Sequence, residues 1–476
     1  MIRPNLVASA SAVVALSLVA VGNAEAQSSR AWISGDHHIH SRWSVGWDTE
    51  TDPPTAIKGG DAIYPIAMNA TMARYYGLSW MVGTDHGGPN HSKVNREQAY
   101  PELLLSRKAV PEVVQFYAME FDTPGADHSS MIMPHTHDEA EKLEELESSF
   151  ATRDAWPRDP TRNTEPKMIE ALEHMRDMDE PPVVIAHHPS RSADSIGVYG
   201  LDAPAEFRRW NNTAPNVAIG MEGAPGHQAV VFRATGDSVT PGPRGAYGRQ
   251  PTMGGFDQMT ARLGGFWDSM LGEGRHWWIT ANSDSHVNWR EGGADFWPGE
   301  YSKTYVYADR AHDDILDGIR GGRVFVTLGD LVSELWVTAE AGGAEAGIGG
   351  ELEVSSGSDV QISVRVLDPA GENSHGDSPE VRRVDVIIGE VHGHLNDPTV
   401  DTNPTTAILQ RFTSSEWSRD GDYIVVNVTI PNVDQDMYVR VRGTNGDELE
   451  PENDPPTEDP WDDLWFYSNP IFLTVR

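Results

Sequence analysis

Two histidines one residue apart constrain the fold of this 476-residue chain more than any other feature. They stand in the stretch Gly35-Asp36-His37-His38-Ile39-His40-Ser41, which follows a short apolar segment. In an extended strand, alternate residues point to the same face, so His38 and His40 converge. Two imidazoles at a strand end, with the carboxylate of Asp36 nearby, are suited to share a divalent cation. Because such pairs are more often surface residues than ligands, a metal site needs further ligands from elsewhere.

Four later stretches supply candidate ligands, and each stands at the end of an apolar run or inside one. They are GTDHG at 83–87, AMEFD at 118–122, IAHHP at 185–189 and ANSDSH at 281–286. Segments with helical spacing alternate with these apolar runs, which predicts an α/β fold whose strand ends share one site. A glutamate inside an apolar strand, such as Glu120, is costly to bury unless it is paired or bound to metal.

The series D-x-H-x-H, TDH, a lone glutamate, HP and SDxH resembles the PHP superfamily, named for polymerase and histidinol phosphatase domains. The resemblance extends from residue 33 to about residue 330. Secreted domains similar to the CehA/McbA metallohydrolases look closest, through WDSMLGEGRHWWITANSDSH and the later GGRVFVTLGD. The resemblance implies an α/β fold of the PHP type, a distorted (β/α)7 barrel whose mouth holds a metal cluster.

The resemblance also implies roles for individual residues. Glu120 would bridge two ions, and Asp85 would orient an imidazole ring beside them. His187 would face the substrate or protonate a leaving group, and Arg191 would clamp a phosphate unless it is an ordinary loop arginine. The implied ligands are His38, His40, His86, Glu120, His128, His188, Asp284 and His286, and Asp48 is a further candidate.

The composition limits which metals fit. The chain has no cysteine, so imidazole and carboxylate must supply every ligand. Such a set favours two or three divalent ions of manganese, zinc or iron.

One ligand position departs from the family pattern. Many relatives place an aspartate or histidine a few residues after the second motif histidine, where this chain has Val45 or Gly46. Asp48 supplies the missing oxygen if the loop carries a two-residue insertion, and otherwise it is a turn residue. Glu222 and His227 follow another predicted strand and are pocket-wall candidates without a motif. Residues 231–256, rich in glycine and proline, are expected to form a long surface loop over the site.

The first residues are typical of a secretory signal. Arg3 precedes an apolar segment from Leu6 to Val21, and Ala24-Glu25-Ala26 fits cleavage before Gln27. We therefore expect a signal peptide at 1–26, a periplasmic or secreted mature protein, and no membrane attachment after cleavage. The formal charge of −36 repels nucleic acid polymers and excludes them as partners.

The sequence changes character at residue 331. Short alternating runs such as DVQISVRVLDP, YIVVNVTIP and MYVRVRG follow, separated by turn residues. Three domains are therefore predicted: the signal peptide at 1–26, the PHP metallohydrolase domain at 27–330, and a β-sandwich of about seven strands at 331–476. The last domain lacks a cluster of ligands, and we expect it to do no chemistry.

These features predict an exported metal-dependent phosphoesterase, favouring phosphodiesters. A metal-bridging hydroxide would attack the phosphorus of a small-molecule phosphoester in line. Two alternatives remain: a hydrolase of carbamates, carboxyl esters or amides on the same metals, and a secreted metal- or glycan-binding protein without turnover. The sequence leaves the leaving group and the oligomeric state open.

Overall fold

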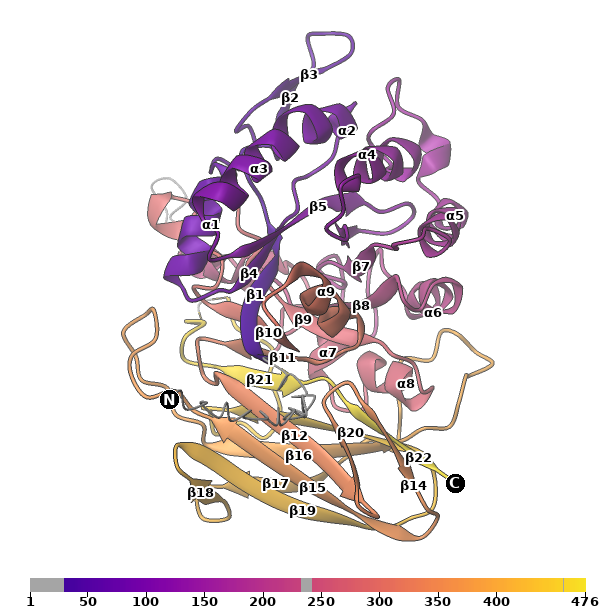
Figure 1. Cartoon of the computed structure of the whole chain (residues 1–476), viewed down its shortest axis with the longest axis vertical. Coiled ribbons are helices and arrows are strands. Elements are labelled where there is room, and N and C mark those ends of the chain that lie inside the picture. The colour runs from indigo at the N-terminus through magenta and orange to yellow at the C-terminus, as the bar shows by residue number, and fades with distance from the viewer. Residues whose placement is uncertain (1–29, 233–241, 457) are drawn as a thin grey trace, which may run out of the picture.

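The computed structural model describes residues 30–232, 242–456 and 458–476. The predicted signal peptide lies outside these residues. The described chain forms a mixed α/β part that continues into a β-rich part (Figure 1). No helix of the described residues is long and apolar enough to cross a lipid bilayer.

One large mixed sheet organises the α/β part, in the order β11-β10-β1-β4-β5-β6-β7-β8-β9. β1, β4 and β5 are parallel, β6 is antiparallel to both of its neighbours, and β7, β8 and β9 are again parallel. The sheet curls so that the end of β9 approaches the end of β1: Ser285, just beyond β9, forms a β-bridge with Ile39. The strands are β1 (Ala31–Ile39), β4 (Trp80–Gly83), β5 (Val114–Asp122), β6 (His128–Ile132), β7 (Val183–Ala186), β8 (Ala218–Ala224), β9 (Trp278–Ala281), β10 (Ser302–Ala308) and β11 (Val324–Leu328).

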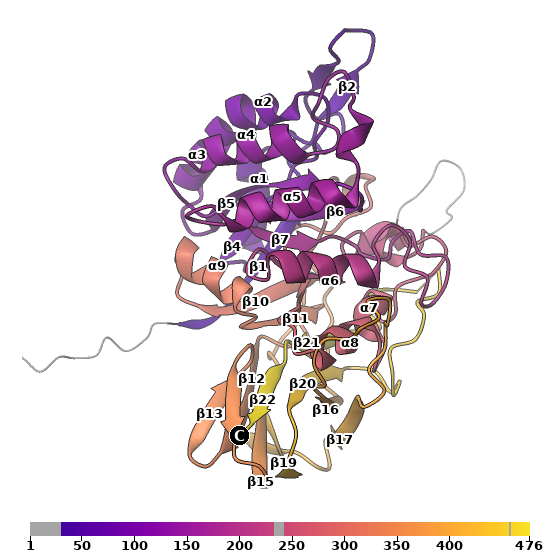
Figure 2. The ribbon, with the colours of Figure 1, turned by 90° about the vertical axis from the view of Figure 1, so that its right-hand side faces the viewer.

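Helices cover the outside of this sheet, and Figure 2 shows α3, α4, α5 and α6 side by side along one flank. In α5 the buried residues Met168, Ala171, Leu172 and Met175 follow the helical spacing i, i+3, i+4, i+7, which explains both the helix and the face that it buries. The helices are α1 (Ile66–Tyr75), α2 (His91–Val94), α3 (Tyr100–Ala109), α4 (Glu139–Phe150), α5 (Glu165–Arg176), α6 (Pro204–Thr213), α7 (Gln258–Ala261), α8 (Phe266–Gly272) and α9 (His312–Arg320).

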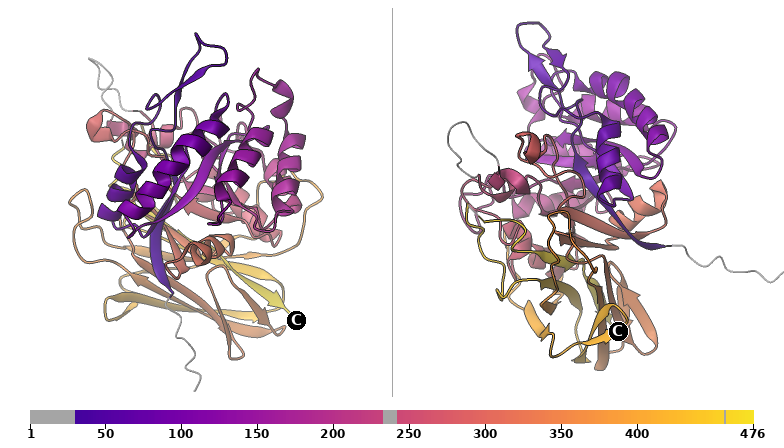
Figure 3. Two further views of the ribbon diagram at one scale, coloured as in Figure 1. Left: turned by 45° about the horizontal axis from the view of Figure 1, so that its top comes forward. Right: turned by 90° about the vertical axis from the view of Figure 1, so that its left-hand side faces the viewer.

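The β-rich part contains a separate antiparallel sheet, in the order β13-β12-β15-β19-β18, and six strands that extend the large sheet. β21 pairs with β11, so the large sheet crosses residue 330 without a break (Figure 2). Figure 3 shows the α/β part and the β-rich part from two further sides. β15 alternates between exposed and buried residues, as a strand with one face on a core requires. The strands are β12 (Glu334–Ala341), β13 (Ala344–Gly347), β14 (Glu351–Val354), β15 (Ser358–Leu367), β16 (Arg383–Glu390), β17 (Ala407–Thr413), β18 (Ser418–Asp420), β19 (Tyr423–Val433), β20 (Met437–Thr444), β21 (Trp465–Ser468) and β22 (Ile471–Val475).

The structure confirms the α/β class and the β-rich region after it. The described part of that region has eleven strands, β12 to β22, where the sequence predicted about seven. Several of the additional strands, such as β18 and β21, are only three or four residues long and carry little alternation of their own. The barrel and the domain boundaries stay predictions.

The segment 231–256, which the sequence predicts to be a surface loop, is partly buried in the structure. Its described residues, 231–232 and 242–256, include the buried side chains of Arg244 and Tyr247. The guanidinium of Arg244 donates hydrogen bonds to Tyr301 and Glu458, so this segment packs between the two parts of the molecule. The glycine and proline content indicated turns correctly but not their burial. Residues 233–241 lie outside the described chain.

Candidate metal centre

A cavity of about 590 Å³ opens where the carboxyl ends of the central strands meet. Parallel strands bring residues from distant parts of the chain together at this edge. Its walls include His86, Glu120, His128, His188, Asp284 and His286.

His38 in β1 and His40 directly after it converge as their spacing predicts. Nε2 of His38 lies 3.0 Å from Nε2 of His40, and both side chains are fully buried. The outer nitrogens are held elsewhere: Nδ1 of His38 lies 2.7 Å from Oε1 of Glu222, and Nδ1 of His40 lies 2.7 Å from Oγ of Ser44. These outer contacts fix the rings so that both inner nitrogens face the same point.

Glu120 lies at the centre of the histidines. Its Oε1 is 3.2 Å from Nε2 of His38 and 3.1 Å from Nδ1 of His128, while its Oε2 is 2.6 Å from Nδ1 of His86. Burial would raise the pKa of this carboxyl, but His128, His86 and His38 outweigh burial and hold it well below its usual value. Glu120 is therefore a carboxylate with both oxygens directed at imidazoles.

Asp284 is the second central carboxylate. Its Oδ1 lies 3.1 Å from Nε2 of His38 and 3.2 Å from Nε2 of His40. Its Oδ2 accepts from Arg191 at 2.8 Å and lies 3.0 Å from Nε2 of His227. The residue has a φ of 48°, in the left-handed region that non-glycine residues seldom adopt, which is a common feature of functional sites.

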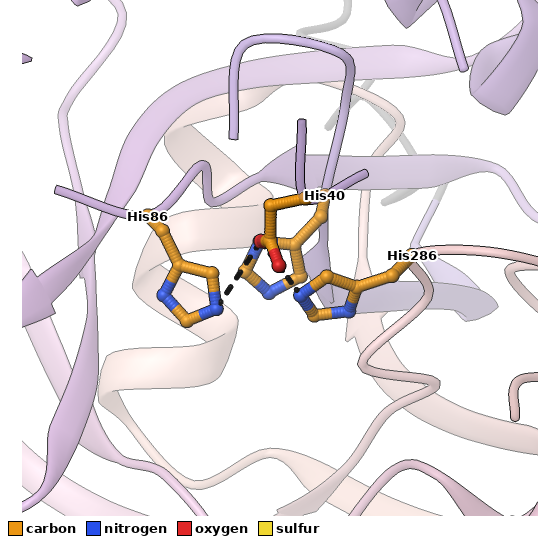
Figure 4. A group of neighbouring side chains, drawn as sticks. His40, His86 and His286 are labelled. Carbon is orange, nitrogen blue, oxygen red and sulfur yellow. Dashed lines mark ion pairs between the residues drawn. The ribbon is translucent and has the colours of Figure 1, made fainter. Parts of the chain in front are cut away.

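A third group surrounds Asp61. Its Oδ2 lies 3.7 Å from Nε2 of His86 and 3.4 Å from Nε2 of His286. One ligand atom from each of His40, Asp61, His86 and His286 lies within 4.8 Å of the others. Figure 4 shows the three imidazole rings of this group close together.

Asp61 takes the place for which the sequence offered Asp48. Asp48 lies in the hairpin of β2 (Gly46–Asp48) and β3 (Thr55–Ile57), and its Oδ1 accepts the backbone N–H of Glu50. Asp48 is thus a turn residue, the second of the two alternatives. No local pattern distinguishes Asp61 from the other aspartates of this glycine- and proline-rich loop.

His128 and His188 complete the inner set. Nδ1 of His128 and Nε2 of His188 lie 3.1 and 3.6 Å from Oε1 of Glu120. Asp122 lies 3.6 Å from the other nitrogen of His128, and Asp127 lies 3.6 Å from that of His188. Both histidines line the cavity, in agreement with their predicted place.

His187 is not among the residues that line the cavity. Its side chain is fully buried, Nδ1 lies 2.8 Å from Oε1 of Glu120, and Nε2 lies 2.6 Å from Oγ of Ser130. Burial and the neighbouring His38 lower its pKa to about 4. Its predicted role as a proton donor therefore lacks support, because a neutral ring with both nitrogens engaged behind Glu120 holds that carboxylate in place.

Asp85 and Asp36 support the ligands from behind. Asp85 accepts from the backbone N–H of Ser41 at 2.6 Å and from its hydroxyl at 2.9 Å. Asp36 accepts from the backbone N–H groups of His38 at 3.0 Å and Ser283 at 3.1 Å, and so joins the first motif to the last. Both aspartates orient backbone. Asp85 also accepts from the hydroxyl of Ser44 at 3.3 Å, and this hydroxyl lies 2.7 Å from Nδ1 of His40, so the contact of Asp85 with an imidazole ring is indirect.

Three residues that carried no motif also contribute. Glu222 holds His38 and accepts the backbone N–H of His188 at 2.6 Å. His227 contacts Asp284 and is itself held by Asp295, whose Oδ1 lies 2.5 Å from its Nδ1. The buried glutamate in the apolar strand β8 was the available signal for Glu222, whereas nothing local indicates Asp295.

The donor set fits divalent metal ions. Oε2 of Glu120, Nδ1 of His86 and Nδ1 of His188 are buried and have no hydrogen-bond partner in the described chain. Oε2 of Glu120 and Nδ1 of His86 face each other without hydrogen-bond geometry, an arrangement that suits two ligands of one ion. Imidazole and carboxylate groups at these distances are compatible with several divalent metals. Searches find no protein family and no curated protein that match this chain.

Proposed function

We propose that this chain is an exported metal-dependent phosphoesterase of the PHP type that hydrolyses small phosphodiesters. The observation that carries the proposal is the convergence of two ionised carboxylates, Glu120 and Asp284, with five histidines that line an open cavity and with the buried His38 and His40 beside them. Few uses other than metal-assisted hydrolysis require so many ligands around one accessible space.

At least two ions are proposed. Glu120 contributes to several groups of ligand atoms, which include His38 with His40, and His86 with His128. Manganese, zinc and iron suit these ligands, and the group around Asp61 would hold a third ion. Divalent ions bound here would lower the pKa of water and stabilise negative charge on a phosphoryl oxygen.

The chain's own residues prepare this chemistry. Glu222 and Ser44 hold the outer nitrogens of His38 and His40, which leaves the inner nitrogens directed at Glu120 and Asp284. Arg191 lines the cavity from beside Asp284, where its guanidinium can also bind a phosphoryl oxygen.

A second candidate function is hydrolysis of a carbamate, carboxyl ester or amide on the same metals. It rests on the charge of the cavity wall: Arg191 is the one arginine or lysine among the described wall residues, and Asp284 pairs with it. A neutral acyl substrate has less need of a cationic clamp. Binding without turnover is the weakest alternative, because the ligand set is complete enough for catalysis.

The wider proposal includes the distorted (β/α)7 barrel, domain boundaries at 27–330 and 331–476, and a signal peptide removed after Ala26. Nucleic acid polymers are poor partners for a chain of formal charge −36.

The test is a panel of chromogenic phosphodiesters, phosphomonoesters, carboxyl esters and carbamates. Purified protein is stripped of metal and then supplied with manganese, zinc or iron. Metal-dependent turnover of phosphoesters supports the proposal, turnover of carboxyl esters or carbamates alone supports the second candidate, and turnover of none with metal bound contradicts both.

A further inference from the structure

β9 is the strand that leads to Asp284 and His286, and it ends only three residues before Asp284. On one side it pairs with β8. On its other edge, the backbone groups of Ile279 and Ala281 face away from β8 and need partners, because alternate residues of a strand direct their N–H and C=O to the same edge.

Two side chains supply those partners in place of a strand. Oδ1 of Asn469 accepts the N–H of Ile279 at 2.9 Å, and Nδ2 of Asn469 donates to the C=O of Ile279 at 3.4 Å. Oγ1 of Thr304 accepts the N–H of Ala281 at 2.8 Å and donates to its C=O at 2.7 Å. Each outward-facing residue of β9 is thus held through both of its backbone groups.

Asn469 comes from the β-rich part, between β21 and β22, and is 1% exposed. Its own N–H donates to the C=O of Val324 at the start of β11, at 3.1 Å. Asn469 therefore links β9 to β11, which do not pair with each other in the described sheet. Asn469 and Ile279 are 190 residues apart in the sequence.

The segment directly after β9 is hydrogen-bonded to the segment that carries His38 and His40. Ser285 forms a bridge with Ile39, and its C=O accepts the N–H of His40 at 3.0 Å. Displacing β9 along its axis would move Asp284 and His286 relative to His38 in β1 and His40 directly after it.

We propose that Asn469 is a positioning residue for the metal centre. Its amide fixes β9 so that Asp284 and His286 meet the histidines of β1. The β-rich part then contributes to metal binding through a residue that is not itself a proposed ligand, which revises the expectation that this region has no part in the chemistry. The inference concerns the ligand set and is independent of which ester is hydrolysed.

The test measures metal affinity without any substrate. Apo full-length protein is titrated with manganese against a competing chelator, for the natural chain and for Asn469→Ala. We expect the weakest bound ion to dissociate with a constant about 10 to 100 times larger in Asn469→Ala, as for other residues that orient ligands from behind. Asn469→Asp keeps the acceptor for Ile279 and should fall between the two.

Two controls separate positioning from loss of stability. Ile362→Ala removes a buried side chain of β15, in the separate antiparallel sheet of the β-rich part, so it destabilises that region without changing the clamp on β9. Asn427→Ala changes an exposed residue of β19 and should alter neither the stability nor the metal affinity. Equal loss of metal affinity in Ile362→Ala and Asn469→Ala, or affinity unchanged within twofold in Asn469→Ala, overturns the proposal. If Asn469→Ala does not fold, Thr304→Val tests the other clamp, and unchanged metal affinity in that folded variant counts against the proposal.

Discussion

Arg440 of β20 and Asp268 of α8 form a bidentate ion pair that joins the β-rich part to the α/β part. Nε and Nη2 of Arg440 donate to the two carboxylate oxygens at 2.8 and 2.7 Å, and both side chains are 1% exposed. Tyr438 and the backbone of Gly264 also donate to Asp268. A buried ion pair therefore connects the two parts, in addition to the continuous sheet through β11 and β21.

We predict that Asp268→Asn lowers the free energy of unfolding by about 3–5 kcal/mol, because it leaves the guanidinium of Arg440 buried without its partner charge. Denaturant unfolding followed by fluorescence and circular dichroism measures the loss. Asp420→Asn is the matched control: it removes the partner of Arg365 in an exposed pair, which is expected to contribute about 1 kcal/mol or less. Equal effects of the two substitutions would contradict the proposed weight of the buried pair.

Glu120→Gln should reduce both metal content and turnover. The carboxylate contacts imidazoles with each oxygen, and an uncharged amide cannot balance two ions. Elemental analysis of the purified variant should show at least one metal ion fewer per chain than the natural protein, which we expect to hold two or more. Full metal content together with full activity would remove Glu120 from the centre.

A comparison of Asp61→Asn with Asp48→Asn tests which aspartate is the ligand. Asp61 lies beside His86 and His286, whereas Asp48 accepts a backbone N–H in its own turn. We expect Asp61→Asn to weaken binding of one metal ion by tenfold or more, and Asp48→Asn to leave the affinity unchanged. The reverse result in metal titrations would restore the alternative with a two-residue insertion.

The motif residues were predictable because each one lies near the end of an apolar strand or just beyond it, and the fold brings these strand ends together at one edge. His38, His86, Glu120, His188 and Asp284 all come together in this way. The remaining contributors depend on long-range packing that no local pattern records. Asp61 belongs to an irregular loop, and the β9 clamp comes from Asn469, far along the chain. The sheet that crosses residue 330 was hidden for the same reason, because a change in strand pattern does not reveal which strands pair.

Glu206 predicts how stability changes with pH. It lies on α6, is 5% exposed, and its Oε1 has no hydrogen-bond partner in the described chain. Burial and the nearby Glu165 raise its pKa from 4.5 to about 8 in the folded protein. The folded state thus keeps a proton that the unfolded state releases, so stability falls as the pH rises from 4.5 to 8.

Glu206→Gln should remove this loss and make the protein more stable than the natural chain at pH 8.5, by on the order of a few kcal/mol. At pH 4 the carboxyl is protonated in both states, so the two proteins should then differ little. Unfolding midpoints measured across this pH range give the comparison. Parallel curves for the two proteins would show that Glu206 titrates normally.

The charge of the cavity predicts which phosphoesters are preferred. Its described wall has the carboxylates of Asp61, Asp127, Glu291 and others, but Arg191 is its one arginine or lysine. Two further arginines near the motifs are already paired with carboxylates, Arg42 with Glu102 at 2.7 Å and Arg153 with Asp122 at 2.6 Å. The chain as a whole has a formal charge of −36, which repels a dianion more strongly than a monoanion. We therefore expect phosphodiesters to be better substrates than phosphomonoesters.

The measurement compares kcat/KM for a diester and a monoester that share one leaving group, at low and at moderate ionic strength. Salt screens the repulsion at long range but not the contacts within the cavity, so the preference for the diester should narrow without reversing. Arg42→Gln should leave the ratio unchanged, because its guanidinium is already paired outside the cavity. A monoester preferred by tenfold, or about 1.4 kcal/mol, at both ionic strengths would mean that the metal ions, and not the acidic wall, decide the substrate charge.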